Sequence, residues 1–301
     1  MNTVSNLSRR ETLTSHKSEG LHGTFHVPGD KSISHRSLIL GGLAIGTTCV
    51  SGLLEGDDVM ATANAMQALG VAITRSEVGV WRIVGVGLHG LTSPEQPLNL
   101  GNSGTGVRLL MGVVAGQPIT ATFTGDESLS ARPMARITCP LEKMGAKISS
   151  RQGGLLPVTI TGTPTPMAAD HVSKVASAQI KSAILLAGLN ARGTTIVSEP
   201  RASRDHSESM MRHFGASVTQ ETKPDGSHHI SLVGEAELVA ADILVPSDPS
   251  SAAFVMVAAL ITAKSDETIP AVGMNPLRIG LITTLQEMGG NIEVSNKRIE
   301  G

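Results

Sequence analysis

The sequence Ala68-Leu69-Gly70-Val71-Ala72-Ile73 indicates how the chain is organised, because its pattern occurs three more times. In each copy a glycine ends an amphipathic helical stretch and opens a run rich in β-branched residues, which is typical of a helix followed by a strand. The other copies are Lys143-Met144-Gly145-Ala146-Lys147-Ile148, His213-Phe214-Gly215-Ala216-Ser217-Val218 and Glu287-Met288-Gly289-Gly290-Asn291-Ile292. The sequence therefore contains four copies of one structural unit.

A second recurring element is a loop of small residues before an apolar helix, roughly 40 residues ahead of each of these glycines. The loops span residues 28–32, 100–105, 175–179 and 245–251. With further strands, such as residues 47–52 and 194–198, each unit is approximately βαβαββ. Crossover helices cover parallel strands, so we predict an α/β fold built from these units. The alternative is ordinary alternation of helices and strands in which the glycines recur by chance.

Two glycine-containing stretches divide the chain into parts. Residues 20–23 precede the first unit, and residues 234–241, rich in small and acidic residues, separate the third unit from the fourth. We therefore expect residues 23–239 to form a first lobe of three units. Residues 240–301 are expected to form the first unit of an incomplete second lobe, which an N-terminal tail, residues 1–22, joins.

The composition excludes several classes of function. The 24 Lys and Arg residues nearly balance the 26 Asp and Glu residues, so no general positive charge attracts nucleic acid or an anionic membrane. One Trp, four Phe and no Tyr leave few side chains for stacking on bases. The apolar run 252–261 is about half of the ~20 residues that a membrane span requires, and it predicts a buried helix. We expect partners that are neither nucleic acid nor membrane.

The N-terminal residues and the cysteines bear on localisation. Residues 1–20 lack the apolar segment of a secretory signal, so we expect the chain in the cytoplasm. Cys49 and Cys139 are far apart in the sequence, have no metal-ligand spacing and lie in apolar periodic stretches. We predict that both are reduced, buried thiols.

Loops of small residues at a helix N-terminus expose backbone N–H groups to an anion. In the first loop Lys31 is followed by Ser32 and, about one turn later, by Arg36. The second loop, residues 102–106, lets a ligand approach the backbone closely and precedes Arg108. Further candidates are Arg132, which directly precedes a proline, and the third-unit group Ser177, Gln179 and Lys181.

Cations from different units converge if these junctions point toward a common centre; the four are Lys31, Arg36, Arg132 and Arg204. Such a cluster on a nearly neutral chain favours a polyanionic ligand. The alternatives are structural, because helix starts of this type are mostly caps, and Asp30 and Asp205 could form surface ion pairs with their neighbours. The sequence has no Walker, HExxH, CxxC or GxSxG motif, so we predict neither a metal nor a cofactor.

Five ordered motifs together resemble the 5-enolpyruvylshikimate-3-phosphate (EPSP) synthase family, from about residue 22 to the end of the chain. Three of the motifs resemble those of the family's second bacterial class: Gly-Asp-Lys at 29–31, Ser-Ala-Gln-Ile-Lys at 177–181 and Arg-Asp-His-Ser-Glu at 204–208. The other two are Gly-Asn-Ser-Gly-Thr-Gly-Val-Arg at 101–108 and Gly-Asp at 125–126 with Arg-Pro-Met at 132–134. The family's six βαβαββ units in two lobes, an inside-out α/β barrel, would account for the repeat.

The resemblance implies transfer of the enolpyruvyl group of phosphoenolpyruvate to the 5-hydroxyl of shikimate 3-phosphate, with release of phosphate, in the shikimate pathway of aromatic amino acid biosynthesis. Both substrates are small polyanions, and a monomer without a cofactor is expected. By motif position, the shikimate 3-phosphate subsite is Lys31, Ser32, Arg36, Ser177, Ala178, Gln179 and Arg204. The phosphoenolpyruvate subsite is Lys31, Asn102, Gly104, Arg132 and Gln179, with Lys31 as the expected catalytic residue.

The chain also departs from the family pattern. The family's fifth and sixth units, with a carboxylate acid/base pair, are not present in these 301 residues, so the alternative is an inactive fragment that binds shikimate 3-phosphate without turnover. A sister family that acts on UDP-N-acetylglucosamine has Cys where this chain has Glu127, which disfavours that function. Glyphosate-tolerant members of the class have Ala in place of Gly104, so we expect sensitivity to this herbicide. Leu277 stands where the class usually has Thr.

Overall fold

The structure is a computed structural model that describes residues 14, 16, 17 and 19–299. Within this part of the chain, three four-stranded sheets share one strand order. In each sheet an edge strand runs parallel to the second strand, the second strand is antiparallel to the third, and the third is antiparallel to the fourth. The second sheet has the order β5 (Leu98–Asn99), β6 (Thr120–Thr124), β8 (Leu155–Thr161), β7 (Lys147–Arg151). The third has the order β9 (Asp170–Val172), β10 (Thr194–Glu199), β12 (His228–Val233), β11 (Val218–Thr222).

Helices connect these strands in the predicted βαβαββ order. In the second unit α3 (Gly104–Ala115) links β5 to β6, and α4 (Glu127–Ser130) and α5 (Ala135–Lys143) link β6 to β7. In the third unit α6 (Ala178–Gly188) links β9 to β10, and α7 (His206–His213) links β10 to β11. The predicted α/β fold of repeated units is confirmed.

The first unit takes its opening strand from a distant part of the chain. The unit itself contains α1 (Lys31–Leu43), β2 (Ile45–Ser51), α2 (Asp57–Ala68), β3 (Ala72–Glu77) and β4 (Val80–Val86). The place beside β2, which the other units fill with their own first strand, is taken by β13 (Ile243–Leu244) in a parallel pairing. We call these three units and β13 the first lobe.

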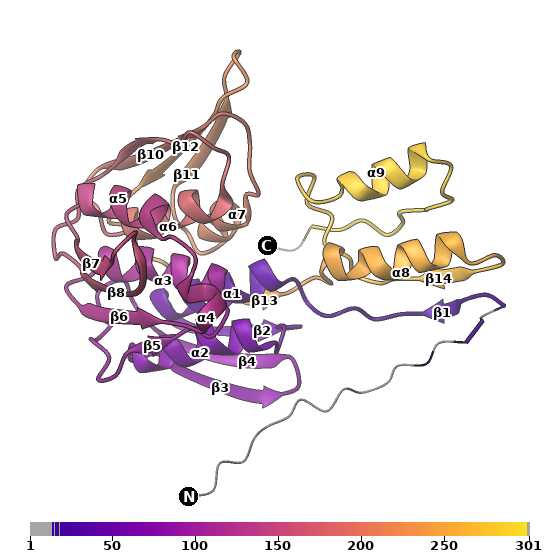
Figure 1. The fold of residues 1–301 in the computed structure, drawn as a ribbon, viewed down its shortest axis with the longest axis horizontal. Coiled ribbons are helices and arrows are strands. Elements are labelled where there is room, and N and C mark those ends of the chain that lie inside the picture. Colours follow the sequence, from indigo (N-terminus) through magenta and orange to yellow (C-terminus); the bar gives the residue numbers. More distant parts are fainter. Residues whose placement is uncertain (1–13, 15, 18, 300–301) are drawn as a thin grey trace, which may run out of the picture.

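The second lobe contains β1 (His22–Thr24), α8 (Pro249–Ile261), β14 (Asp266–Thr268) and α9 (Gly280–Glu287) (Figure 1). Its β1 pairs in parallel with β14. The segments that precede α1 and α8 have therefore exchanged lobes, because β1 pairs in the second lobe and β13 in the first. This exchange makes the two lobes mutually dependent for strand pairing.

The predicted domain borders stay predictions. Ile243 and Leu244 were expected in the second lobe, but they are hydrogen-bonded to the first sheet because its parallel edge position is open to a later segment. Of the predicted tail, Leu21 donates its N–H to Ser265 Oγ at 3.0 Å. Residues 1–13, 15 and 18 of that tail lie outside the described residues.

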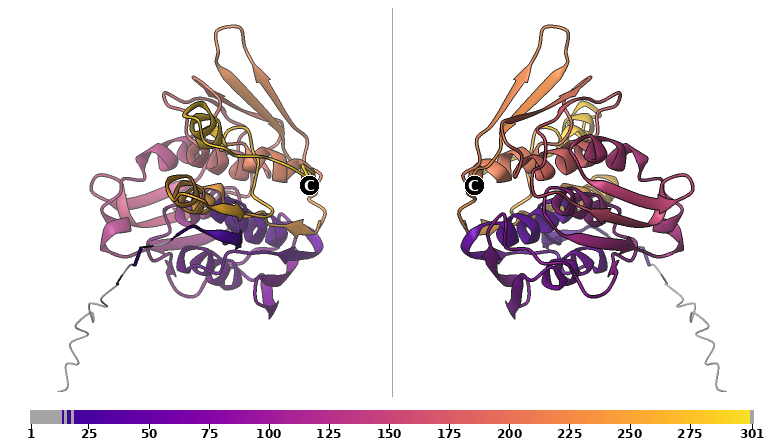
Figure 2. Two further views of the ribbon diagram at one scale, coloured as in Figure 1. Left: turned by 90° about the vertical axis from the view of Figure 1, so that its right-hand side faces the viewer. Right: turned by 90° about the vertical axis from the view of Figure 1, so that its left-hand side faces the viewer.

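The interior of the first lobe consists of helices, and its sheets lie outside them (Figures 1 and 2). Most residues of helices α1, α3 and α6 are buried, and in α1 and α6 these include polar and charged side chains. Glycine allows α3 and α6 to approach closely, since a Cβ added at Gly112 would lie 2.3 Å from the carbonyl oxygen of Ala183. The N-termini of these helices come from the three small-residue loops.

The apolar run 252–261 is helical, but the prediction that this helix is buried is wrong. In α8 the side chains of Phe254 and Ile261 are 80% and 79% exposed, and only Pro249 and Ala252 are buried. An apolar run predicts a helix, but it does not show whether another element packs against that helix. Within the described part of the chain, no helix is long and apolar enough to cross a membrane.

The prediction of buried cysteines is also wrong. Both Cys49 and Cys139 are free and exposed. On β2 the side chains alternate between the two faces, so Thr48 and Val50 point inward and Cys49 points outward. On α5, Ile137, Thr138, Pro140 and Leu141 face the core, and Cys139 lies on the opposite side.

Candidate active site

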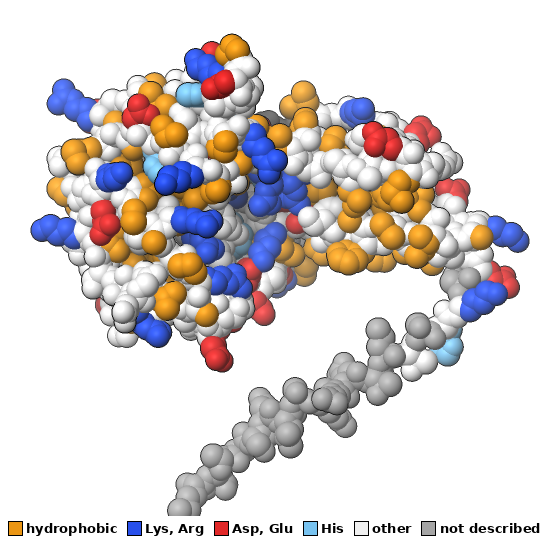
Figure 3. All heavy atoms as spheres, turned by 45° about the horizontal axis from the view of Figure 1, so that its top comes forward, with side chains coloured by type: hydrophobic (Ala, Val, Ile, Leu, Met, Phe, Trp, Pro, Cys, Tyr) orange, Lys and Arg blue, Asp and Glu red, His pale blue; other side chains and the backbone are white. Residues whose placement is uncertain are grey.

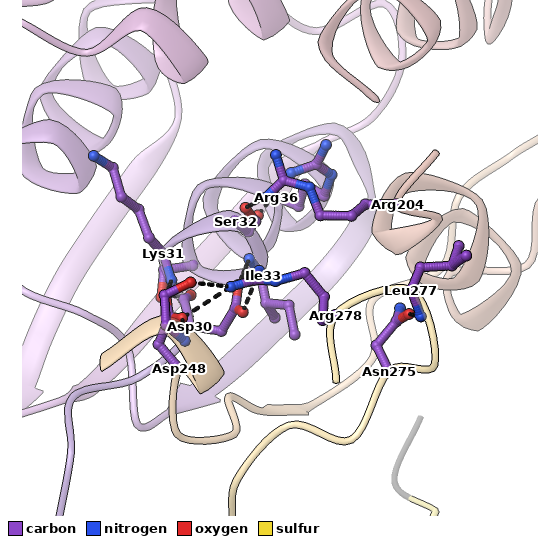
Figure 4. Close-up of polar contacts among 12 residues, drawn as sticks. Asp30, Lys31, Ser32, Ile33, Arg36, Arg204, Asp248, Asn275, Leu277 and Arg278 are labelled. Atoms are coloured by element: carbon purple, nitrogen blue, oxygen red, sulfur yellow. Dashed lines mark hydrogen bonds and ion pairs between the residues drawn. The ribbon is translucent and has the colours of Figure 1, made fainter. Parts of the chain in front are cut away.

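The N-terminus of α1 opens toward the junction of the two lobes (Figure 4). The carboxylate of Asp30 caps this helix by accepting the N–H of Ile33 at 2.9 Å, which fixes the first turn. Lys31 is the first residue of the helix, and its side chain is 45% exposed and paired with the carboxylate of Asp58 on α2. The predicted catalytic ammonium group therefore lies at the surface of the junction, where a ligand can compete for it.

The first cationic group contains the guanidinium groups of Arg36 and Arg204, which both donate to the neutral Ser32. Arg36 is buried and donates from Nε to Ser207 Oγ at 2.7 Å, from Nη2 to Ser182 Oγ at 2.9 Å and from Nη1 to the Ser32 carbonyl at 2.9 Å. Burial is the main reason why the pKa of Arg36 falls to about 10, so the side chain stays charged at neutral pH. Arg204 comes from the third unit and donates to Ser32 Oγ at 3.5 Å.

A pocket of about 630 Å³ lies at the N-terminus of α6. All four residues that the sequence predicts for the third unit's part of the shikimate 3-phosphate subsite line it. The complete lining is Ala176, Ser177, Ala178, Gln179, Arg201, Ala202, Ser203 and Arg204. The pocket thus joins a helix N-terminus to two arginines, an arrangement suited to an anion.

Glu199 holds the two walls of this pocket together from below. One oxygen of its carboxylate accepts the Ser177 N–H at 2.7 Å, and the other accepts the Ser203 hydroxyl at 2.7 Å. The latter oxygen also lies 3.3 Å from the ammonium of Lys181. Because Glu199 is almost fully buried, these charge-assisted contacts hold Ser177 and Ser203, which both line the pocket, in fixed positions.

Lys181 lies beneath the pocket and does not line it, which corrects the prediction that it supplies a ligand group. Its ammonium is fully buried and also pairs with Glu208 at 2.7 Å. Burial raises the pKa of Glu208, and the charge of Lys181 opposes that rise. Two carboxylates share one buried cation, so Lys181 serves to position Glu199.

The second cationic group surrounds Gly104 at the N-terminus of α3. Arg132 donates to the amide oxygen of Asn102 at 2.7 Å, and Asn102 in turn donates to Asp126 at 2.8 Å. A Cβ added at Gly104 would lie 3.0 Å from Nη1 of Arg132 and 2.9 Å from Nη1 of Arg108. The three residues predicted only for the phosphoenolpyruvate subsite therefore lie together.

Gln179 connects the two groups. It lines the pocket beside Arg204, and its amide donates to Thr105 Oγ1 at 3.1 Å, next to Gly104. The space-filling view shows Lys and Arg side chains gathered where the first lobe faces the second (Figure 3). The sequence predicts that the cations meet at one common centre, whereas the structure has two adjacent groups that Gln179 connects. Direct convergence of Lys31 with Arg132 stays a prediction.

Sequence reasoning missed several residues that support this site. Asp248 carries a detectable signal, since it precedes a proline at the first helical position, and it caps α8. Glu199 and Arg278 carry none, because their partners come from other elements. The sequence allows a surface ion pair between Asp30 and its neighbouring cations, but in the structure Asp30 is buried and binds Arg278.

Comparison with known proteins agrees with this geometry. The sequence model of the family described as EPSP synthase (3-phosphoshikimate 1-carboxyvinyltransferase) matches residues 15–300. The chain belongs to the EPSP synthase family. The resemblance inferred from the five motifs is confirmed.

Relatives of this family are similar along nearly the whole chain. A 3-phosphoshikimate 1-carboxyvinyltransferase of Rhodopseudomonas palustris is 56% identical over 98% of this chain and 66% of its own length. The enzyme of that name from Parvibaculum lavamentivorans is 55% identical over 96% of this chain and 64% of its own length. The EPSP synthase structure from Acinetobacter baumannii is 49% identical, with a TM-score of 0.88, over 95% of this chain and 63% of that one. The chain thus spans about two thirds of the length of these relatives.

Proposed function

We propose that this chain carries the EPSP synthase site, which transfers the enolpyruvyl group of phosphoenolpyruvate to the 5-hydroxyl of shikimate 3-phosphate. The observation that carries the proposal is the pocket at α6, since its lining unites Ser177, Ala178, Gln179 and Arg204. Family membership over residues 15–300 supports the same reaction. The sister reaction on UDP-N-acetylglucosamine is not favoured, because the relatives are named 3-phosphoshikimate 1-carboxyvinyltransferase.

Shikimate 3-phosphate is assigned to the pocket and to the adjoining N-terminus of α1. Backbone N–H groups at the start of α6 and the guanidinium of Arg204 suit its phosphate. Arg204 donates a hydrogen bond to Ser32, so both side chains can contact one ligand. Arg36 is buried with its guanidinium bonded to two serines and a carbonyl, so we assign it to the same subsite from beneath.

Phosphoenolpyruvate is assigned to the group around Gly104. Arg132 and Asn102 present donors there, and the absence of a side chain at Gly104 leaves space between the two guanidinium groups. Gln179 and Lys31 are assigned contacts with both substrates. Positive charge on both sides of two bound anions offsets their mutual repulsion and orients them for reaction.

In the proposed reaction the 5-hydroxyl oxygen bonds to C2 of phosphoenolpyruvate and gives up its proton, while C3 gains a proton and the C2–C3 double bond becomes a single bond. The resulting tetrahedral adduct then expels phosphate as the C2–O bond breaks and the proton on C3 is lost, which restores the double bond. The ammonium group of Lys31 stabilises the charge on the departing phosphate. Asp58, which pairs with Lys31 in the structure, gives up this contact when an anionic ligand enters.

Phosphate release measured with both substrates tests this proposal. The proposed function predicts phosphate release that requires both shikimate 3-phosphate and phosphoenolpyruvate and that is lost in Lys31→Met. Binding of shikimate 3-phosphate without phosphate release would favour the inactive binding fragment. Failure of shikimate 3-phosphate to bind would contradict both.

We further propose that the chain acts as a monomer in the cytoplasm. The two free and exposed cysteines fit a reducing compartment, where such thiols persist. Sedimentation of the purified chain and fractionation of its own cells test the two statements separately.

A further inference from the structure

The loop of residues 275–278 in the second lobe reaches across to the first lobe at two points. Arg278 contacts Asp30, and Asn275 contacts Asp205. Each of these aspartates is adjacent in sequence to a residue of the proposed shikimate 3-phosphate subsite, since Asp30 precedes Lys31 and Asp205 follows Arg204. The loop therefore contacts a residue next to each side of that subsite, and Figure 4 shows its contact with Asp30.

Arg278 binds two carboxylates with one guanidinium group. Its Nη1 lies 3.1 Å from Asp30 Oδ2, and its Nη2 lies 3.0 Å from Asp248 Oδ1. Nη2 also donates to Ser250 Oγ at 2.8 Å. The side chains of Arg278, Asp30 and Asp248 are only 10%, 2% and 11% exposed, so solvent screens these pairs weakly.

The two carboxylates are the N-caps of helices in different lobes. Asp30 caps α1 and Asp248 caps α8, and Asp248 Oδ2 also accepts the Lys31 N–H at 3.2 Å. The two segments that cross between the lobes are paired at this point, because Asp30 N–H donates to Pro246 and Asp248 N–H to Pro28 at 2.7 and 2.8 Å. One guanidinium thus bridges both capping carboxylates at the point where the chain passes between the lobes.

Asn275 makes the second connection. Its amide donates to Asp205 Oδ1 at 2.6 Å, and Asp205 precedes the first residue of α7. The same Asn275 uses its side-chain oxygen to accept the Leu277 N–H at 2.8 Å, which fixes the turn of the loop that presents Arg278. Both connections therefore depend on one compact loop.

We propose that the 275–278 loop is a brace that sets the distance between the two sides of the shikimate 3-phosphate subsite, with Arg278 as its principal positioning residue. The inference rests on the proposed function for its ligand, although the brace itself is a property of the unliganded protein. Without Arg278, Asp30 and Asp248 face each other as two buried carboxylates, and the first turn of α1 loses its fixed position. Lys31 and Ser32 then move relative to Arg204.

Hydrogen exchange of the unliganded 301-residue chain tests the brace without a ligand. In Arg278→Met, amides 31–34 should exchange at least about tenfold faster, while α3 keeps its protection. Arg278→Lys keeps the charge but lacks the two-branched fork, so it should give a smaller increase at the same amides. Asn275→Ala should speed exchange at amides 205–209 and, because it also loosens the turn that presents Arg278, at amides 31–34 by less than Arg278→Met does. The exposed Arg82→Met on β4 is the matched control and should change neither region.

Calorimetric titration of shikimate 3-phosphate into the same variants tests the consequence for binding. Arg278→Met should bind this ligand about tenfold more weakly than the unaltered chain, and Arg278→Lys should recover part of the loss. Unchanged affinity in Arg278→Met would overturn the positioning role even if exchange at amides 31–34 increases.

The outcomes separate the brace from the proposed function. Unchanged exchange at amides 31–34 in Arg278→Met overturns the brace whatever the ligand does. If Arg278→Met loses protection in α3 as well, it has unfolded, and Arg278→Lys decides by the same amides. If the unaltered chain binds no shikimate 3-phosphate, the proposed function and the role of the brace in binding that ligand both fail, while exchange still decides whether the brace exists.

Discussion

A side chain at Gly104 would have little room in the proposed phosphoenolpyruvate subsite. We expect Gly104→Ala to weaken binding of phosphoenolpyruvate and of glyphosate, because the new methyl displaces the guanidinium ends of Arg108 and Arg132. One methyl group in a binding site changes affinity by roughly tenfold or more. Titration of glyphosate with shikimate 3-phosphate present measures the effect. Equal glyphosate affinity in the two proteins would contradict the assignment, and shikimate 3-phosphate affinity on its own should not change.

His35 makes the stability of the first lobe depend on pH. Burial, followed by the charges of Arg36 and Lys31, lowers the pKa of this histidine to about 3 from 6.5. The unfolded chain therefore takes up the proton first, so this contribution is complete above pH 6.5 and is lost as the pH falls from 6.5 toward 3.

The non-titrating variant His35→Gln measures this contribution. Between pH 7.5 and pH 5.5 the original chain should lose about 1.4 kcal/mol more unfolding free energy than the variant. Urea unfolding at the two pH values gives both numbers. Equal losses in the two proteins would show that His35 does not bind a proton on unfolding.

Single residues also show what the sequence could and could not predict. Lys31, Ser32 and Arg204 were found because they stand beside recognisable loops and motifs, and the structure brings Ser32 and Arg204 into contact. Glu199 and Arg278 were missed because charged residues of this kind occur on every surface. Their importance depends on burial and on partners from other elements, which a linear pattern does not contain.

The packing of α3 against α6 places the two proposed subsites side by side. Gly112 of α3 lies against the backbone of Ala183 in α6, so a methyl group there has no flexible neighbour to displace. Gly112→Ala should lower the unfolding free energy by about 2 kcal/mol, although alanine favours a helix, because overpacking outweighs propensity.

Gly280→Ala is the matched control for this packing. A Cβ at Gly280, the first residue of α9, meets nothing within 4 Å, so the change should alter stability by less than about 1 kcal/mol. Chemical denaturation of both variants provides the comparison. If Gly112→Ala is as stable as Gly280→Ala, close packing of α3 and α6 does not support the site.

At the level of elements, local signals predicted the units well and their surroundings poorly. Glycine stops, small-residue loops and β-branched runs identified the βαβαββ order, because each signal depends on neighbouring residues. The exposure of α8 and of Cys49 escaped prediction, since an apolar pattern reports the composition of a surface and not what lies against it.

The whole molecule depends on the exchange of strands between its two lobes. His22 lies opposite Asp266, and Ile243 lies opposite Val50, so each lobe contains a strand from the segment that leads into the other. Pairings of two or three residues between such distant segments leave no periodic signal, which is why the sequence could not place them. They bring Asp30 and Asp248 together at the crossing, next to the proposed subsite.

Calorimetric titration of shikimate 3-phosphate, with shikimate as the comparison ligand, tests whether the pocket at α6 holds the phosphate group. We expect one shikimate 3-phosphate to bind per chain, shikimate to bind at least about a hundredfold more weakly, and Arg204→Met to lose affinity for shikimate 3-phosphate by about tenfold or more. Equal affinity for shikimate and shikimate 3-phosphate, or unchanged binding in Arg204→Met, would contradict the claim that the pocket at α6 holds the phosphate group.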